Sequence, residues 1–205
     1  MNNHNNSGLP IVPLRYSVPL LVICIVALGI LVFVFNLSAP VVLFTPPVGA
    51  VNVTSCGVLG QNDTYYYLNM SLSFPGVTCF TITGNNTVLD GESMQTLVGN
   101  NTPGTAGVIV LGKNVTVKGL NISSADVGIL LNGAPNATIT LNYINNSAHH
   151  AVLLNLSSSS KVTQNILSYP NFYGVLLELS SYNIVQNNLV LANCSPPNLI
   201  TLPKA

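Results

Sequence analysis

Charge is the scarcest property of this sequence. Its 205 residues include only five Lys or Arg and five Asp or Glu, so the formal net charge is 0. An ordinary globular domain has about a quarter of its residues charged. Because binding to nucleic acid depends on clustered basic side chains, this composition excludes a nucleic-acid partner.

Tryptophan is absent, and the chain has neither a Cys-x-x-Cys motif nor a Gly-rich phosphate-binding loop. The common sequence signs of a redox pair or a nucleotide site are therefore missing. Two other features are abundant, because 48% of the residues are hydrophobic and 27 are Asn. A chain this apolar is not disordered, and its length beyond one apolar segment fits a single domain.

The longest uncharged apolar run extends from Val18 to Phe35 and continues to Leu37. A membrane-spanning helix needs about 20 such residues, and we therefore predict one transmembrane α-helix over residues 18–37. The run is longer than a normal signal-peptide core, which favours a retained anchor over a cleaved signal.

The basic residues indicate which side of the membrane the chain occupies. Arg15 precedes the apolar run, and no Lys or Arg follows until Lys113. By the positive-inside rule, residues 1–17 form a cytoplasmic tail and the C-terminal domain is extracellular. The expected location is the cell membrane, with a single span.

Glycosylation sequons support the same orientation. The pattern Asn-x-Ser/Thr occurs eleven times after the apolar run. This density predicts N-linked glycans that keep the surface soluble where other proteins use charge. The sequon residues are Asn52, Asn62, Asn69, Asn85, Asn100, Asn114, Asn121, Asn136, Asn145, Asn155 and Asn193.

Residues 38–55 read as a linker that is stiffened by Pro40, Pro46 and Pro47. Within it, Val41–Phe44 is apolar. This short stretch is interpreted either as an extension of the anchor at the membrane interface or as a strand that docks on the domain.

The domain itself is built on a repeat of 21 to 23 residues. Successive copies begin at Gly107, Gly128, Ala151 and Gly174, and a looser, earlier copy carries an insertion around residues 99–104. A period of this length indicates a solenoid, and the short β-branched runs favour strands over helices. We predict an all-β fold, a parallel β-helix of about five turns over residues 56–194, with a tail or cap over 195–205.

Residues one repeat apart should stack in columns of similar size that fill the core. Aligned Asn residues near one turn should form an amide ladder along the stack. The predicted inward columns are Val108, Ile129, Val152 and Val175; Val110, Leu131, Leu154 and Leu177; and Val117, Ile139, Val162 and Ile184. A further apolar position closes each repeat, at Ile122, Ile144, Leu167 and Leu189. Leu120, Asn142, Asn165 and Asn187 are the residues aligned at that turn, and Thr116, Thr138, Lys161 and Asn183 should face solvent.

One outward column is apolar, which is unusual for a solvated face. It comprises Ile109, Leu130, Leu153 and Leu176. Either a loop or Val41–Phe44 covers this stripe, or it is an interface for a protein partner or a second copy. The open end of the solenoid is a second candidate interface, because it exposes strand edges.

The layout resembles the right-handed parallel β-helix superfamily, which includes pectate-lyase-like proteins and copper-accessory repeat proteins of cell surfaces. The first turns are similar to those of archaeal and some bacterial extracellular members. The resemblance implies the fold but not an activity, because the superfamily contains lyases, hydrolases, epimerases and inert structural or adhesive proteins. The stretches that carry it are Cys56-Gly57, Tyr66–Leu68, Thr78–Ile82 and Asn86–Gly91.

Cysteine spacing permits one disulfide in the domain. Cys56 and Cys79 flank the first turn and could be joined, which would stabilise the fold by about 3 kcal/mol. Cys194 lies several turns away from both, so it is either free or links two chains.

Catalytic chemistry has few candidate residues. Resemblance to polysaccharide lyases implies a Ca²⁺ site and an Arg or Lys base, but no Arg follows the apolar run. Asp90 and Glu92 are the sole close acidic pair, so they are the only catalytic candidates, and a structural turn is the favoured interpretation. Adjacent His149 and His150 should point to opposite faces. We therefore expect no metal site and no cofactor.

Tyr65–Tyr67 admit two interpretations. The three rings could offer a platform for stacking sugars, or they could cap the end of the solenoid. For the whole chain we expect a membrane-anchored, glycosylated β-helix with a structural or interaction role, such as an envelope component, filament or complex subunit, or adhesin. The alternatives are a carbohydrate-active enzyme and a carbohydrate-binding module without catalysis.

Overall fold

The computed structural model describes residues 20–26, 29–35, 45–191 and 198–201. The chain divides into two compact units, residues 1–45 and residues 46–205.

In the first unit, strands β1 (Leu20–Val26) and β2 (Gly29–Phe35) pair antiparallel, with Leu20 opposite Phe35. Val, Ile and Phe dominate both strands and favour extended structure. The transmembrane helix expected over residues 18–37 is therefore not confirmed. Among the described residues, no helix has the length and hydropathy needed to cross a bilayer.

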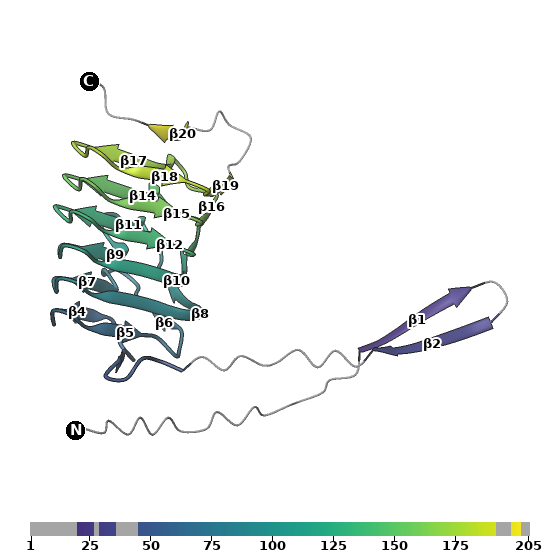
Figure 1. Ribbon diagram of the computed structural model, residues 1–205. Coiled ribbons are helices and arrows are strands. Elements are labelled where there is room, and N and C mark those ends of the chain that lie inside the picture. The colour runs from purple at the N-terminus through teal and green to yellow at the C-terminus, as the bar shows by residue number, and fades with distance from the viewer. Residues whose placement is uncertain (1–19, 27–28, 36–44, 192–197, 202–205) are drawn as a thin grey trace, which may run out of the picture. The chain divides into compact units, whose positions relative to one another are not determined.

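The second unit is a parallel β-solenoid, as the repeat predicts (Figure 1). One of its walls is a seven-stranded sheet in which neighbouring strands are parallel and come from successive turns. Seven strands make about six turns rather than the five expected. Its strands are β4 (Gly57–Leu59), β7 (Phe80–Ile82), β9 (Ala106–Val110), β11 (Val127–Asn132), β14 (His150–Asn155), β17 (Tyr173–Glu178) and β20 (Asn198–Thr201).

An eleven-stranded sheet forms the remaining walls. The long strands β8 and β10 continue past a corner at which the later turns break into two short strands, so the sheet has two arms. Its strands are β3 (Val51–Asn52), β5 (Tyr65–Tyr67), β6 (Leu72–Ser73), β8 (Val88–Val98), β10 (Thr116–Ser123), β12 (Thr138–Thr140), β13 (Tyr143–Asn145), β15 (Lys161–Thr163), β16 (Ile166–Ser168), β18 (Ile184–Gln186) and β19 (Leu189–Leu191).

Both predicted boundaries of the domain shift outward in the structure. Strand β3 pairs with β5, so the solenoid begins inside the segment expected to be a linker. Strand β20 pairs with β17, so the segment expected to be a tail or cap contributes a strand. Val41–Phe44 and Cys194 lie outside the described residues.

The core consists of stacked columns of aliphatic side chains. The columns through Val108 and Val110 are confirmed over four turns, and every member is buried. Val117, Ile139 and Val162 form the third column, and Ile122, Ile144 and Leu167 form the fourth. Truncating one of these side chains to Ala would cost about 2–5 kcal/mol.

The last turn departs from the prediction by one residue. Val162 pairs with Val185 and Leu167 pairs with Val190, so Ile184 and Leu189 face outward with 44% and 52% of their surface exposed. Ile184, not Asn183, therefore continues the solvent-facing column. Apolar residues occupy both adjacent positions, and a shift of one residue reverses the face to which every side chain points.

The corners of the solenoid depend on left-handed backbone conformations. Among the described residues, sixteen other than Gly have a positive φ, and six of these are Asn, a residue type that tolerates this region well. At one corner, Leu141 (φ 56°), Gln164 (φ 58°) and Asn187 (φ 55°) occupy equivalent places. Part of the Asn excess is therefore explained by the geometry of the turns.

The predicted amide ladder follows directly after this corner. Oδ1 of Asn142 accepts the backbone N–H of Leu120 at 3.1 Å, and Oδ1 of Asn165 accepts the N–H of Asn142 at 3.0 Å. Its fourth member is Asn188 rather than Asn187, because the N–H of Asn165 donates to Oδ1 of Asn188 at 2.9 Å. The ladder supplies the hydrogen bonds that the corner removes from the sheet.

The predicted disulfide is confirmed. Cys56 and Cys79 are bonded with a Cα–Cα distance of 4.5 Å, and Cys79 is buried. The bond ties together the first two turns, where the repeat is least regular.

Candidate functional site

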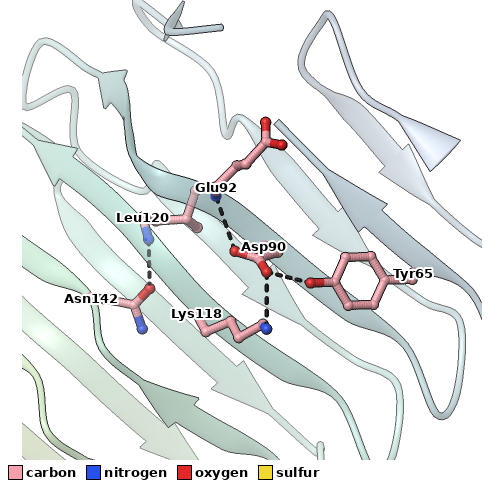
Figure 2. A network of polar contacts seen from close by, with 6 residues as sticks. All are labelled: Tyr65, Asp90, Glu92, Lys118, Leu120 and Asn142. Atoms are coloured by element: carbon pink, nitrogen blue, oxygen red, sulfur yellow. Dashed lines mark hydrogen bonds and ion pairs between the residues drawn. The ribbon is translucent and has the colours of Figure 1, made fainter. Parts of the chain in front are cut away.

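Asp90 is the centre of a polar network on the outside of the eleven-stranded sheet (Figure 2). Its Oδ2 accepts the phenolic O–H of Tyr65 and lies 2.9 Å from Nζ of Lys118, and its Oδ1 accepts the backbone N–H of Glu92 at 3.0 Å. Nζ of Lys118 also lies 5.4 Å from the centre of the Tyr65 ring. The carboxylate is thus bonded to three partners, which lie on the neighbouring strands β5, β8 and β10.

A bulge in β8 positions this network. Asp90 pairs with Lys118, but the next pair joins Gln95 to Leu120, so β8 contains extra residues at the corner. Gly91 packs against the backbone there, since a Cβ at this position would lie 2.3 Å from the carbonyl oxygen of Gly119. The N–H of Glu92 lies two residues after Asp90, so this hydrogen bond is local to the bulge.

The pKa shifts of Asp90, Tyr65 and Lys118 are unfavourable for acid–base catalysis. Burial alone would raise the pKa of Asp90, but hydrogen bonds from Tyr65, Lys118 and Glu92 outweigh it and lower the pKa. Burial and the bond to Asp90 raise the pKa of Tyr65, and the hydrogen bond to Asp90 raises the pKa of Lys118 despite burial. A general acid or base needs a pKa near the working pH, whereas these shifts move all three groups away from neutrality.

The two acidic residues proposed as catalytic have different surroundings. Asp90 is buried and fully bonded, while Glu92 has a positive φ of 43° and a side chain that points away from Asp90 in Figure 2. Burial and the nearby charge of Asp90 raise the pKa of Glu92. This arrangement supports the structural interpretation, in which Asp90 fastens the bulge.

The tyrosines of the first turn also have structural contacts. Tyr66 is buried in the core, and its phenolic oxygen accepts the backbone N–H of Gln61 at 3.2 Å. Tyr65 is bonded to Asp90. Two of the three rings are therefore committed to the first turn, which favours the capping interpretation over a sugar platform.

The predicted aliphatic stripe exists on the outer face of the seven-stranded sheet. Leu130 pairs with Ile109 and with Leu153, and Leu153 pairs with Leu176. All four side chains are half-buried. We call this column and the strands that carry it, β9, β11, β14 and β17, the aliphatic face.

Two further outward columns flank the stripe. On one side Val127, His150 and Tyr173 are in register, and on the other Asn132, Asn155 and Glu178 are in register. Nδ2 of Asn155 donates to Oδ1 of Asn132 at 3.1 Å. Glu178 is the one charged residue in these three columns, so the face is nearly neutral.

A histidine cluster lies at the edge of the aliphatic face, where strands β11, β14 and β17 begin. Nδ1 of His149 is bonded to Oδ1 of Asp126, and Oδ2 of Asp126 accepts the N–H of Gly104 at 2.7 Å. The ring of His149 stacks on Phe172, with centroids 5.2 Å apart and an interplanar angle of 18°. Asp126 is buried, whereas the His149 side chain is 47% exposed.

His150 begins strand β14 beside this pair. Its ring stacks on Tyr173 with centroids 5.3 Å apart, and its Nδ1 is buried without a hydrogen-bond partner. Burial, followed by the charge of His149, lowers the pKa of His150, although Asp126 opposes this shift. The expectation that the two histidines diverge is wrong, because His149 precedes the strand and the ring centroids are 6.0 Å apart.

Sequence reasoning missed the cluster, although the repeat contains its signal. Asp126, His149 and Phe172 are each 23 residues apart, as are Val127, His150 and Tyr173. Polar and aromatic residues in one column should therefore have been expected to stack.

The sequons are distributed unevenly over the surface. Of the ten sequon Asn residues in the described region, only Asn155 lies in a strand of the seven-stranded sheet. Asn85, Asn121, Asn145 and Asn155 are half-buried, and the other six are exposed. The exposed sequon residues are Asn52, Asn62, Asn69, Asn100, Asn114 and Asn136.

Comparison with known proteins identifies a family. Residues 50–200 match the model of the NosD family, which is described as periplasmic copper-binding protein. A solved structure with a similar fold is the enzymatically active domain of tailspike protein 2 from bacteriophage CBA120, with a TM-score of 0.48 and 14% identity over 69% of this chain. This chain covers 31% of that protein's length. No curated protein matches the chain significantly.

The donors available for copper are few. Among the described residues, no group of three or more His, Cys, Asp or Glu side chains could hold a metal ion, and Cys56 and Cys79 are consumed by the disulfide. A site with three or four protein ligands therefore does not fit this part of the chain.

Proposed function

Since the chain belongs to the NosD family, we propose that it is a β-helix protein displayed outside the cytoplasm, with a structural role at the cell surface. We also propose that residues 18–37 anchor it by a single span with the N-terminus in the cytoplasm, because this run is apolar and uncharged and Arg15 precedes it. Neighbouring copies associate through the aliphatic face. The in-register stripe of Ile109, Leu130, Leu153 and Leu176 is the observation that carries the proposal.

The chemistry of the aliphatic face favours a neutral partner such as a second copy. With Glu178 as the one charged residue in the stripe and its flanking columns, two such faces can meet without burying many charges. A surface that binds glycans or acidic polymers would instead be expected to carry basic or hydrogen-bonding side chains. Self-association is also consistent with the low charge of the whole chain.

The size of the face predicts a weak contact. Six residues of β14 extend about 20 Å, and the four strands β9, β11, β14 and β17 extend about 19 Å. Two such faces would bury about 760 Å² in total, below the roughly 1,000 Å² of the smallest specific interfaces. Anchoring in one membrane would raise the effective concentration of the copies and so support a weak contact.

The positions of the sequons also favour the aliphatic face as the contact surface. N-linked glycans on the six exposed sequon residues would lie outside the strands of the seven-stranded sheet. Asn155 is the exception, and its side chain is half-buried and bonded to Asn132. Glycans would therefore cover the other walls of the solenoid and leave the aliphatic face free for contact.

The alternative of a carbohydrate-active enzyme has less support. Its sole candidate pair is Asp90 and Glu92, and Asp90 is bonded to Tyr65, Lys118 and the bulge. The pKa of Asp90 is lowered, whereas a glycosidase acid requires a raised one.

A charge introduced into the stripe tests the proposal. We would express the full chain in membranes and measure crosslinked dimers for the wild type, Leu130→Glu and the matched control Thr138→Glu. Leu130 and Thr138 are both half-buried strand residues of the same turn, but they lie on different sheets. We expect dimers in the wild type and the control and at least a tenfold loss in Leu130→Glu, with all three melting cooperatively.

Two outcomes would contradict self-association. The first is a wild type that is monomeric at every density in the membrane. The second is an unchanged dimer yield in Leu130→Glu. If the wild type instead binds immobilised glycans and Leu130→Glu does not, the face belongs to a carbohydrate-binding module.

A further inference from the structure

His150 lies in one of the two columns that flank the stripe of the aliphatic face, in register with Val127 and Tyr173. Its ring is half-buried in the single chain, so a second copy seated on this face would cover it further. Given the self-association proposed above, on which this inference rests, we propose that protonation of His150 releases the contact. Copies would then associate at neutral pH and separate in mildly acidic surroundings.

The surroundings of His150 fit a neutral ring better than a charged one. The ring stacks on Tyr173 with centroids 5.3 Å apart and makes an edge contact with Phe172, and its Nδ1 is buried without a hydrogen-bond partner. A neutral imidazole keeps one nitrogen without a proton, whereas the protonated ring carries an N–H on both nitrogens. Protonation would therefore place a buried N–H where no described residue accepts it, and an unsatisfied donor of this kind costs free energy.

The charged groups around His150 also favour its neutral form. The carboxylate of Asp126 is bonded to Nδ1 of His149 and accepts the N–H of Gly104, so it is committed to other partners. Burial and then the charge of His149 lower the pKa of His150 below its ordinary 6.5, although Asp126 opposes the shift. His150 is therefore neutral at neutral pH and gains its proton only in acid. The other titratable groups on or directly beside strands β11, β14 and β17 are Asp126, His149, Tyr173 and, in the opposite flanking column, Glu178.

Association of two copies and protonation of His150 oppose each other. Removal from water disfavours a charged group, so a second copy on the aliphatic face would lower the pKa of His150 further. The separated copies therefore bind the proton more tightly, and acid favours separation by mass action. Each copy contributes one such histidine. Below the pKa of the separated copies, the dissociation constant should rise by up to about tenfold per pH unit for each of the two.

Energy transfer between copies at two pH values tests the switch. The full chain would be labelled at its C-terminus with pH-insensitive donor and acceptor dyes, reconstituted in vesicles, and measured at about pH 7.5 and about pH 5, on either side of the histidine range. We expect the apparent dissociation constant of the wild type to be at least about tenfold higher at the lower pH. His150→Gln, and His150→Phe, which keeps an aromatic ring against Tyr173, should remain associated at both pH values. His4→Gln, which removes a histidine of the N-terminal segment, is the matched control and should separate like the wild type.

The outcomes separate the switch from the self-association on which it rests. Circular dichroism at both pH values would show that the solenoid stays folded, so that loss of transfer reports separation and not unfolding in acid. Equal transfer by the wild type at both pH values, or a loss in His150→Gln and His150→Phe that matches the wild type, would overturn the switch and leave self-association standing. A wild type without transfer at neutral pH would overturn both.

Discussion

Asn165 is bonded twice to Asn142, which lies one turn earlier. Its Oδ1 accepts both the backbone N–H and the side-chain N–H of Asn142, each at 3.0 Å. Both side chains are buried, and the side-chain N–H of Asn165 donates to the carbonyl oxygen of Ile139 at 3.0 Å. The amide ladder therefore bonds successive turns to one another inside the solenoid, in addition to the sheets.

Replacing Asn165 by Ala should destabilise the solenoid more than the loss of side-chain volume suggests. The change leaves two N–H groups of Asn142 and the carbonyl oxygen of Ile139 without this partner, and each buried unsatisfied group costs about 1–3 kcal/mol. We expect a loss of about 3–5 kcal/mol, measured by urea unfolding. Asn171→Ala, at an exposed position, should change stability by less than about 0.5 kcal/mol; similar losses in both variants would refute a structural ladder.

Asp90→Asn should lower stability, whereas Glu92→Gln should not. The first change removes the charge that bonds Tyr65, Lys118 and the bulge, and hydrogen bonds to a charged group contribute about 1.5–3 kcal/mol. The second alters a side chain that points away from the network. Thermal unfolding would measure both, and a catalytic role would be supported if Glu92→Gln abolished a glycan-cleaving activity without changing the melting temperature.

The stability of the fold should also depend on pH through Asp90. Because its pKa is lower in the folded state than the ordinary 3.8, its contribution is present above that value and is lost as the pH falls through the folded pKa. The wild type should therefore lose stability on acidification below about pH 5 more steeply than Asp90→Asn. Parallel curves of melting temperature against pH would show that Asp90 does not titrate as the network requires.

Glycan occupancy should follow exposure. The six exposed sequon residues should be occupied more fully than Asn121, Asn145 and Asn155, which are half-buried in or beside strands. Asn121 is the sharpest case, because its Oδ1 is buried without a partner. Mass spectrometry of glycopeptides from native membranes would measure this order, and full occupancy at Asn121 would contradict it.

The regular part of the repeat made the architecture predictable. Between Val108 and Leu177 the copies differ by at most two residues in length, so inward and outward positions could be assigned from the period of the pattern. The prediction fails at the last turn, where Ile184 and Val185 are both apolar and parity alone cannot choose between them. The same ambiguity separates Leu189 from Val190.

The candidate sites were less predictable, for different physical reasons. The insertion in β8 displaces the chain after Asp90, so its ion pair with Lys118 depends on a register that the period does not specify. His149 and Asp126 are bonded and lie one repeat apart, but an analysis of hydrophobic patterns does not identify columns of polar residues. Over residues 18–37, the same apolar run is compatible with a helix in lipid and with the paired strands β1 and β2.

The amide ladder and the left-handed corners recur every 23 residues from Asn142 to Asn188. Each turn carries the donors and acceptors required by the turns on either side of it. A tandem duplication of 23 codons would therefore insert a complete turn whose donors and acceptors match those of the turns on either side. A deletion of the same length would remove one turn. Evolution can thus adjust how far such a protein extends without inventing a new core.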